Sequence, residues 1–149
     1  KIGGKSEMIS SNKTKGFTLV ELLIVIVVIA ILAAISIVAY NGVTQKARDD
    51  ERVATARNLV NAAAAYNSEH DKWPAHSDLT TFQTVKLTGA AADSSKVSTT
   101  ANPDADHNTY KYTVCQDGGK DSGVKVEYYK EIASGTETAG VKSLTTGKC

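Results

Sequence analysis

The stretch that decides the fold runs from Lys15 to Tyr40 and reads KGFTLVELLIVIVVIAILAAISIVAY. From Leu22 to Tyr40 it is apolar apart from Ser36, and it contains no charge, proline or glycine. As a helix, this run would be about 28 Å long, close to the roughly 30 Å hydrocarbon thickness of a bilayer. Its Leu, Ile and Val side chains favour insertion by about 4–8 kcal/mol. Since strands rarely exceed about ten residues, we expect a membrane-spanning helix.

Charges on the two flanks of this run predict its orientation in a membrane. Residues Lys1 to Gly16 hold four lysines and one glutamate, and no further lysine or arginine occurs until Lys46. Positively charged flanks tend to stay in the cytoplasm. We therefore expect a single-pass membrane protein with a cytoplasmic N-terminus and its C-terminal part outside.

The helix is expected to continue through Asp71, because no proline lies between Phe17 and Trp73. Trp73-Pro74 should end it. Beyond Tyr40 the apolar residues form a helical stripe, comprising Val43, Ala47, Val53, Ala56, Val60, Ala63 and Asn67, with Leu59, Ala64 and Tyr66 beside it. The opposite, charged face is expected to hold Lys46, Arg48, Asp49, Asp50, Glu51, Arg52 and Arg57.

The remaining residues predict a small antiparallel β-sheet packed on the amphipathic part of the helix. Strands are expected at Tyr110–Gln116, Val124–Ala133 and Val141–Thr145, after a loop-rich connector with short helical pieces at Leu79–Leu87. The fold class is therefore α+β, with a long N-terminal helix whose first half spans the membrane and whose second half is amphipathic.

Both cysteines, Cys115 and Cys149, follow the apolar run. If that side of the chain is exported, its surroundings are oxidising and a disulfide is the natural outcome. The bridge would stabilise the fold by about 3–4 kcal/mol. Two unrelated free thiols remain the alternative.

The residues just before the apolar run carry the functional signal. A conventional secretory signal has its cleavage site after the apolar core, whereas here Gly16 and Phe17 precede it and Glu21 follows closely. This arrangement resembles the type IV prepilin signature, in which a basic leader ending in Gly precedes Phe-Thr-Leu-x-Glu and an apolar helix. The likeness covers Lys15 to Tyr40.

The resemblance implies that a prepilin peptidase/methyltransferase cuts between Gly16 and Phe17 and methylates the new Phe17 amine. It also makes Glu21 the assembly carboxylate, which pairs with the Phe17 amine of another subunit. A carboxylate at the edge of a membrane helix is costly, which independently favours a functional role. The chain then divides into a leader (1–16), a transmembrane and filament-core helix (17–40), an amphipathic helix (41–73) and a globular domain (74–149).

By the same resemblance, the protein is a structural subunit of a type IV pilus. It waits in membrane lipid and is polymerised by the pilus assembly machinery into a homopolymeric extracellular filament for adhesion, twitching motility or DNA uptake. Two weaker signals are Tyr66 followed by Trp73-Pro74 and the late cysteine pair, which implies that Cys115–Cys149 pins the last strand. A pseudopilin of a type II secretion system, a minor pilin and a non-polymerising anchored binding domain remain alternatives.

One departure from the family pattern concerns the apolar helix. Many relatives carry Gly at the position of Ala30 and Pro at the position of Val38, and their helix loosens between these positions on assembly. Since this chain has neither breaker, we expect its helix to stay continuous in a filament.

Other chemistries find little support in the sequence. The run Asn102–Asp106 suggests calcium, but an EF-hand would require Gly at His107 and Glu at Thr113, so a solvated turn is expected. The histidines lack metal-ligand spacing with the cysteines, and His70, His76 and His107 are expected on the surface. No catalytic motif, cofactor site or metal site is indicated, and the interspersed charges do not suggest a nucleic-acid site.

Overall fold

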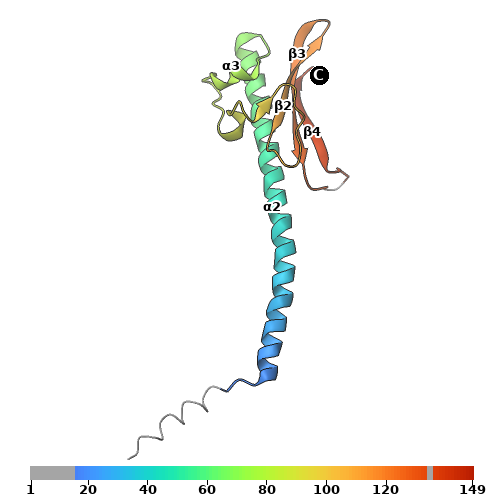
Figure 1. Cartoon of the computed structure of the whole chain (residues 1–149). Helices are drawn as coiled ribbons and strands as arrows, with labels where there is room; N and C mark the ends of the chain where they lie inside the picture. The colour runs from blue at the N-terminus through green and yellow to red at the C-terminus, as the bar shows by residue number, and fades with distance from the viewer. Residues whose placement is uncertain (1–15, 134–135) are drawn as a thin grey trace, which may run out of the picture. The chain divides into compact units, whose positions relative to one another are not determined.

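The computed structural model describes residues 16–133 and 136–149, so the predicted leader lies, apart from Gly16, outside the described residues. The chain forms two compact units, Lys1–Gly42 and Val43–Cys149. We call the second unit the head. The elements (Figure 1) are α2 (Leu19–His70), α3 (His76–Thr80), the 3-10 helix η1 (Gly89–Ala91), β1 (Val97–Ser98), β2 (Tyr110–Asp117), β3 (Lys120–Lys130) and β4 (Gly140–Gly147).

Helix α2 is one uninterrupted helix of 52 residues, as the sequence predicts. It ends at His70, one residue before the predicted end. The reason is the backbone of Asp71, whose φ of 52° is left-handed, a conformation common just after a helix. The Asp71 amide still donates to the Asn67 carbonyl oxygen at 2.8 Å. Trp73-Pro74 therefore follows a helix that has already stopped.

The sheet has the order β1-β2-β3-β4. The predicted antiparallel pairing of the three long strands is confirmed. The bounds of β3 are shifted, since it begins at Lys120 and ends at Lys130 rather than running from Val124 to Ala133. Between β2 and β3, Gly118 and Gly119 have φ values of 61° and 81°, as a two-residue type I′ turn requires.

Strand β1 was not predicted. It is only two residues long and pairs in parallel with β2, with Val97 opposite Tyr110 and Ser98 opposite Lys111. A segment this short has no periodicity of its own, and only its position beside β2 makes it a strand. The sheet is therefore mixed rather than purely antiparallel.

The core of the head lies between one face of α2 and one face of the sheet. Ala56, Leu59 and Ala63 recur at helical spacing and are fully buried. From the sheet, alternate residues of β2 and β3 face them, namely Tyr110, Tyr112, Val124, Val126 and Tyr128. Helix α3 adds Leu79 to this core.

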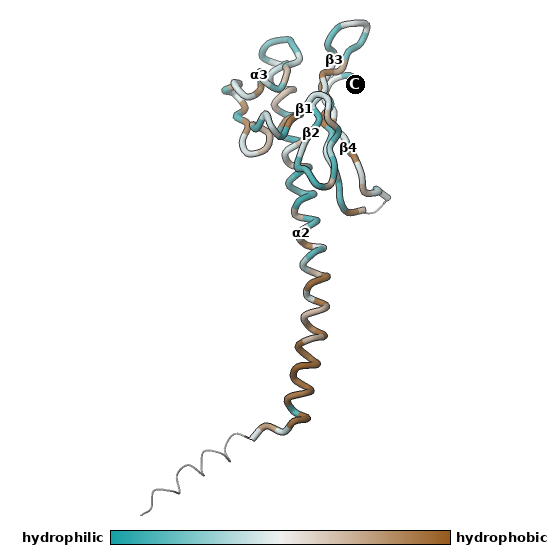
Figure 2. Tube along the Cα trace, viewed as in Figure 1, coloured by the Kyte–Doolittle hydropathy of each residue, from teal (hydrophilic) through white to brown (hydrophobic). Residues whose placement is uncertain are grey.

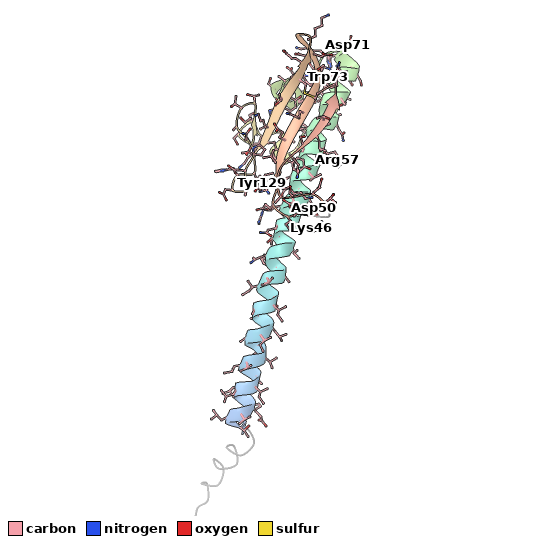
Figure 3. All side chains as sticks on the ribbon, turned by 90° about the vertical axis from the view of Figure 1, so that its right-hand side faces the viewer. Lys46, Asp50, Arg57, Asp71, Trp73 and Tyr129 are labelled. Carbon is pink, nitrogen blue, oxygen red and sulfur yellow. A yellow bond between two sulfur atoms is a disulfide. The ribbon has the colours of Figure 1, made fainter. Side chains whose placement is uncertain are left out.

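The assignment of Asp49 and Arg52 to an exposed charged face was wrong. The two residues are only 5% and 3% exposed, because they continue the helical face of Ala56 and Leu59. By contrast, Lys46, Asp50 and Arg57 project from α2, as Figure 3 shows. The predicted i,i+4 pair between Lys46 and Asp50 is present at 3.5 Å.

Asp49 anchors the chain just beyond β3. Its two carboxylate oxygens accept hydrogen bonds from the backbone amides of Glu131 and Ile132, at 2.8 and 2.9 Å. The Glu131 carboxylate in turn accepts from Arg48 at 2.8 Å and lies 3.3 Å from Arg52. The hydrogen bond to Glu131 raises the pKa of the Arg48 guanidinium.

Arg52 reaches further segments of the head. Its guanidinium donates to the side chain of Asn108 at 3.0 Å and to the backbone oxygens of Ala105 and Tyr129, at 3.3 and 3.4 Å. It also lies 3.5 Å from Asp49. A buried charge is tolerated only when it is paired and hydrogen-bonded. Asp49 and Arg52 therefore meet that condition and tie two loops to the helix.

Candidate functional site

The N-terminus of α2 is built by Thr18 and Glu21. The Thr18 hydroxyl accepts a hydrogen bond from the Glu21 amide at 3.1 Å, and the Glu21 carboxylate accepts one from the Thr18 amide at 3.2 Å. This reciprocal arrangement is a capping box, with Thr18 at the N-cap and Glu21 at the third helical position. The carboxylate also lies where the helix dipole favours negative charge.

The predicted cleavage position lies just before this cap. Gly16 and Phe17 precede the helix in non-helical backbone, and both are exposed. The Phe17 side chain is 84% exposed. A peptide bond in extended, exposed backbone is accessible to a protease, whereas one inside a helix is not. Gly16, Phe17 and Glu21 thus lie within six residues of sequence at the start of the helix.

The apolar segment, Leu22–Tyr40, exposes its large side chains on every side of the helix. Leu22, Ile29 and Ile37, for example, are each more than half exposed. In Figure 2 this part of α2 is brown, the colour of hydrophobic residues. Ser36 satisfies its hydroxyl by donating to the Leu32 carbonyl oxygen at 2.8 Å. The segment therefore presents a continuous apolar surface in which the Ser36 hydroxyl is satisfied within the helix.

A surface of this kind requires a cover. By length and composition the helix could cross a membrane. Monomeric soluble proteins rarely expose contiguous apolar patches larger than a few hundred Å². Lipid and the same segment of other copies are both chemically suitable covers, because each is apolar and neither offers partners for a charge.

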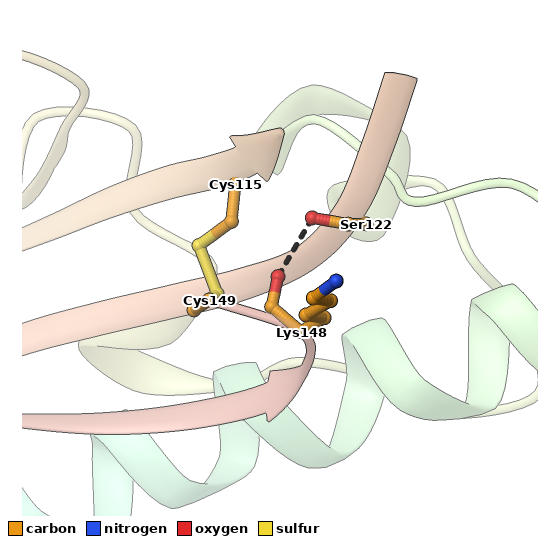
Figure 4. The surroundings of a disulfide bond; sticks show 4 residues. All are labelled: Cys115, Ser122, Lys148 and Cys149. Atoms are coloured by element: carbon orange, nitrogen blue, oxygen red, sulfur yellow. Dashed lines mark hydrogen bonds between the residues drawn. A yellow bond between two sulfur atoms is a disulfide. The ribbon is translucent and has the colours of Figure 1, made fainter. Parts of the chain in front are cut away.

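The predicted disulfide between Cys115 and Cys149 is present (Figure 4), with Cα atoms 5.2 Å apart. It joins β2 to the residues that follow β4. Beside it, the Ser122 hydroxyl donates to the Lys148 carbonyl oxygen at 2.7 Å. The Lys148 amide donates to the Ser122 carbonyl oxygen at 2.8 Å. These bonds hold the last residues against β3.

Trp73 also packs against the C-terminal end of the sheet. A Cβ added to Gly147 would lie 2.5 Å from a Trp73 ring carbon, and one added to Gly123 would lie 2.5 Å from the Thr146 carbonyl oxygen. Both positions therefore require glycine for close approach. The ring of Trp73 packs on the backbone at the end of β4.

The three histidines lie in different surroundings. His70 and His107 are exposed as expected, but His76 is buried, and its Nε2 lies 2.8 Å from the Ala91 carbonyl oxygen. His76 had no recognisable signal in the sequence, because burial here depends on η1 folding over it. Asp104 accepts the His107 amide at 2.7 Å within a tight turn. Among residues 16–133 and 136–149, no group of three or more His, Cys, Asp or Glu side chains could hold a metal ion.

Comparison with known proteins agrees with this N-terminal arrangement. Residues 11–37 match the family described as "Prokaryotic N-terminal methylation motif". Over 60 residues the chain is 43% identical to the type IV major pilin protein PilE1 of Neisseria gonorrhoeae, covering 40% of this chain and 36% of that protein.

Two further relatives give the same result. Identity is 40% over 62 residues with a fimbrial protein of Neisseria meningitidis serogroup A, covering 42% of this chain and 36% of the relative. It is 43% over 61 residues with the fimbrial protein EcpC of Eikenella corrodens, covering 41% and 40%. These alignments span well under half of each relative's length, and no solved structure matches the chain significantly. In the methylation motif and over these alignments the chain is therefore similar to the type IV pilin family.

Proposed function

We propose that the protein is a structural subunit of a type IV pilus, held in the membrane and then polymerised through α2 into a surface filament. The observation that carries this proposal is the exposed apolar segment, Leu22–Tyr40, directly behind a capped helix start that contains Glu21. In this role the protein is structural and not catalytic. Adhesion, twitching motility and DNA uptake are finer roles that the family resemblance suggests.

Processing comes first in the proposed mechanism. A prepilin peptidase would cut between Gly16 and Phe17 on the cytoplasmic side, remove the basic leader and leave a free amine on Phe17, which is then methylated. The exposed, non-helical backbone at these residues supports the proposal. The membrane orientation, with the head outside, follows from the charge difference across the segment.

Glu21 would act in the next step. One of its carboxylate oxygens accepts the Thr18 amide, so the other remains suitable for a cation. The free amine of Phe17 on a neighbouring copy would supply that cation after cleavage. In an apolar filament core, such a pair would be strong, and removing one partner would cost about 3–5 kcal/mol.

Moving the apolar segment from lipid into a bundle of helices changes its hydrophobic free energy little, because both surroundings are apolar. Extraction therefore requires assembly machinery, and the pairing of Glu21 would give the subunit a preferred position. The segment Ala30–Val38 is helical in the subunit, and we propose that it remains so in the filament.

Three substitutions separate the charge of Glu21 from its capping role. Glu21→Gln keeps an acceptor for the Thr18 amide but removes the charge, Glu21→Ala removes both, and Thr18→Ala removes one capping bond only. We expect Glu21→Gln and Glu21→Ala to abolish sheared filaments almost equally, while Thr18→Ala retains a substantial yield. Normal filaments from Glu21→Gln would show that the carboxylate acts only as a cap and would contradict the proposed pairing.

A pseudopilin or minor pilin makes a different prediction about abundance. A major subunit should be the dominant protein in sheared surface filaments, whereas a minor component should be scarce beside another subunit. A non-polymerising anchored domain should remain entirely in the membrane fraction. Quantitative mass spectrometry of the sheared and membrane fractions distinguishes the three.

A further inference from the structure

An open cavity of about 360 Å³ lies where α3 and the residues after it meet the last turns of α2. Three of the residues that line it carry rings, namely Tyr66 and His70 from α2 and Phe82 from the segment after α3. Tyr66 and His70 are four residues apart, so both rings lie on one face of the helix. All of these residues belong to the head (Figure 1), so the cavity lies within one compact unit.

The three rings pack against one another, and we call them the aromatic corner. The Tyr66 and His70 rings are stacked, with centroids 4.1 Å apart and planes 17° apart. The Phe82 ring is T-shaped to both, with its centroid 5.2 Å from that of Tyr66 and 6.0 Å from that of His70. Because these two distances are similar, Phe82 lies beside the stack and not on top of it. The aromatic corner is therefore already formed without a ligand.

The His70 ring has a fixed orientation in this corner. Its Nδ1 lies 3.2 Å from the Tyr66 carbonyl oxygen. Since a carbonyl oxygen can only accept a hydrogen bond, we assign the hydrogen to Nδ1, and Nε2 of the neutral ring is then an acceptor. In its neutral form His70 thus adds an aromatic face and an acceptor, but no positive charge.

Two carboxylates line the same cavity, those of Glu69 and Asp78. One Asp78 oxygen accepts the Ala75 amide at 3.0 Å, which holds this carboxylate at the start of α3. In the part of the chain that the structure describes, neither carboxylate forms a salt bridge. The described residues that line the cavity also include no lysine or arginine. The cavity therefore has a negative charge that no cationic side chain of its lining balances.

The chemistry of the cavity favours an organic cation over a metal ion. Although Glu69, His70 and Asp78 line one cavity, no group of His, Cys, Asp or Glu among the described residues could hold a metal ion. A hard metal ion requires several oxygen ligands at about 2.0–2.6 Å. An ammonium ion requires only an aromatic ring within about 6 Å and carboxylates in its surroundings. Its carbon groups also gain from contact with rings.

We propose that this cavity binds a small organic ammonium ion. The charged group of the ligand lies between the aromatic corner and the carboxylates of Glu69 and Asp78. The carboxylates attract the charge, and the rings supply an apolar wall whose electrons attract it further. The volume is in the range of small-molecule sites. This binding activity goes beyond filament assembly and does not depend on it.

Titration of the full chain with choline tests the proposal, in maltoside micelles because these contain no ammonium group. Nuclear magnetic resonance of the aromatic side chains should show saturable shifts of Tyr66, His70 and Phe82. Tyr110, which is buried under the sheet, should not shift. Dimethylbutanol, in which carbon replaces the charged nitrogen of choline, should bind at least about five-fold more weakly. Calcium at matched ionic strength should not displace choline.

Two substitutions remove one negative charge each from α2. Glu69 lines the cavity, whereas Glu51 is exposed on the same helix and does not line it. Glu69→Gln should raise the Kd for choline about three-fold, which is typical of an exposed charge pair. Glu51→Gln is the matched control and should leave the Kd unchanged.

Two further substitutions test the aromatic corner. Tyr66→Leu removes a ring and should raise the Kd for choline about five-fold, whereas Tyr66→Phe keeps the ring and should change it little. Urea titration followed by Trp73 fluorescence shows whether each variant is folded. Because Glu69 is exposed, Glu69→Gln still tests the site if Tyr66→Leu unfolds the head.

Three results would each overturn the proposal. They are equal binding of choline and dimethylbutanol, equal losses with Glu69→Gln and Glu51→Gln, and titration without saturable shifts. Displacement of choline by calcium would likewise contradict recognition by the aromatic corner. The measurement requires no filaments, so its failure is distinct from failure of the proposed pilus role.

Discussion

The two halves of helix α2 lie in one continuous helix but have opposite relations to their surroundings. In the apolar segment, Leu22–Tyr40, apolar side chains are exposed in every direction. In the second half, the head buries Ala56 and Leu59, and it also buries two charged side chains, Asp49 and Arg52. Hydrophobic residues thus lie outside in one half, and charged residues lie inside in the other.

The difference shows that burial follows from the available partners and not from residue type alone. Asp49 and Arg52 are buried because backbone amides and carbonyls of the head are positioned to meet them. Among residues 16–133 and 136–149 the apolar segment has no such partners, and in the proposed function lipid and other copies take their place. Four changes, taken from the largest expected effect to the smallest, test this contrast.

Arg52→Met should lower the free energy of unfolding of the head by about 3–5 kcal/mol, because Asp49 loses its buried partner. Lys46→Met is the matched control, since it breaks an exposed pair with Asp50 that contributes less than about 1 kcal/mol. Urea titration of the full chain in detergent, followed by fluorescence of the single tryptophan, Trp73, measures both. If both variants lowered the free energy of unfolding equally, the contrast between buried and exposed charged residues would be contradicted.

Replacing both Cys115 and Cys149 by serine should lower the stability of the head by about 3–4 kcal/mol, because the unfolded chain gains freedom. The apolar segment should be unaffected, since the bridge lies within the head. Circular dichroism before and after unfolding of the head separates the two contributions. Loss of the helical signal from residues 22–40 together with the head would show that the two halves are not independent.

Leu59→Ala should cost the head about 3 kcal/mol through lost burial and a residual cavity. The same change at Leu32, which is exposed, should leave the stability of the head unchanged. The same urea titration reports both. A loss of stability with Leu32→Ala would mean that the apolar segment is covered by its own chain.

Tyr112 gives the head a dependence on alkaline pH. Burial, with a smaller effect of the Asp78 carboxylate, raises the pKa of its phenol above the ordinary value of 10.0. The folded state therefore prefers the neutral phenol. This contribution is complete below pH 10 and is lost as the pH rises above it.

Between pH 10 and pH 11, Tyr112 alone should lower the stability by about 1 kcal/mol. Tyr112→Phe removes this dependence and also the hydrogen bond to the Pro74 carbonyl oxygen, which is 2.8 Å long. Its stability should be lower at pH 8 but should fall less steeply above pH 10. A parallel fall in both proteins would assign the alkaline loss to other groups.

Much of the fold could be predicted because its signals are local. The length of the apolar run, the absence of proline before Pro74 and the alternation in β2 each depend on neighbours in sequence. The turn at Gly118-Gly119 is equally local. The capping box of Thr18 and Glu21 is also local, but it was not predicted from the sequence.

The sequence-based predictions that were missed or wrong concern features that arise only from tertiary contacts. Strand β1 exists because β2 lies beside it, and His76 is buried because Ala91 covers it. The burial of Asp49 and Arg52 required knowledge of the loops they meet, which lie more than 50 residues away in the sequence. Their spacing on the Ala56 face was visible, but their charge pointed to solvent.

The most direct test of the account is the N-terminus of the protein isolated from sheared surface filaments. Intact-mass and terminal-peptide mass spectrometry should find a chain that begins with Phe17 carrying one methyl group, in material that sediments as a polymer. A chain that begins upstream of Phe17 and remains monomeric in the membrane fraction would contradict the claim that the apolar helix is first stored in lipid and then used for assembly.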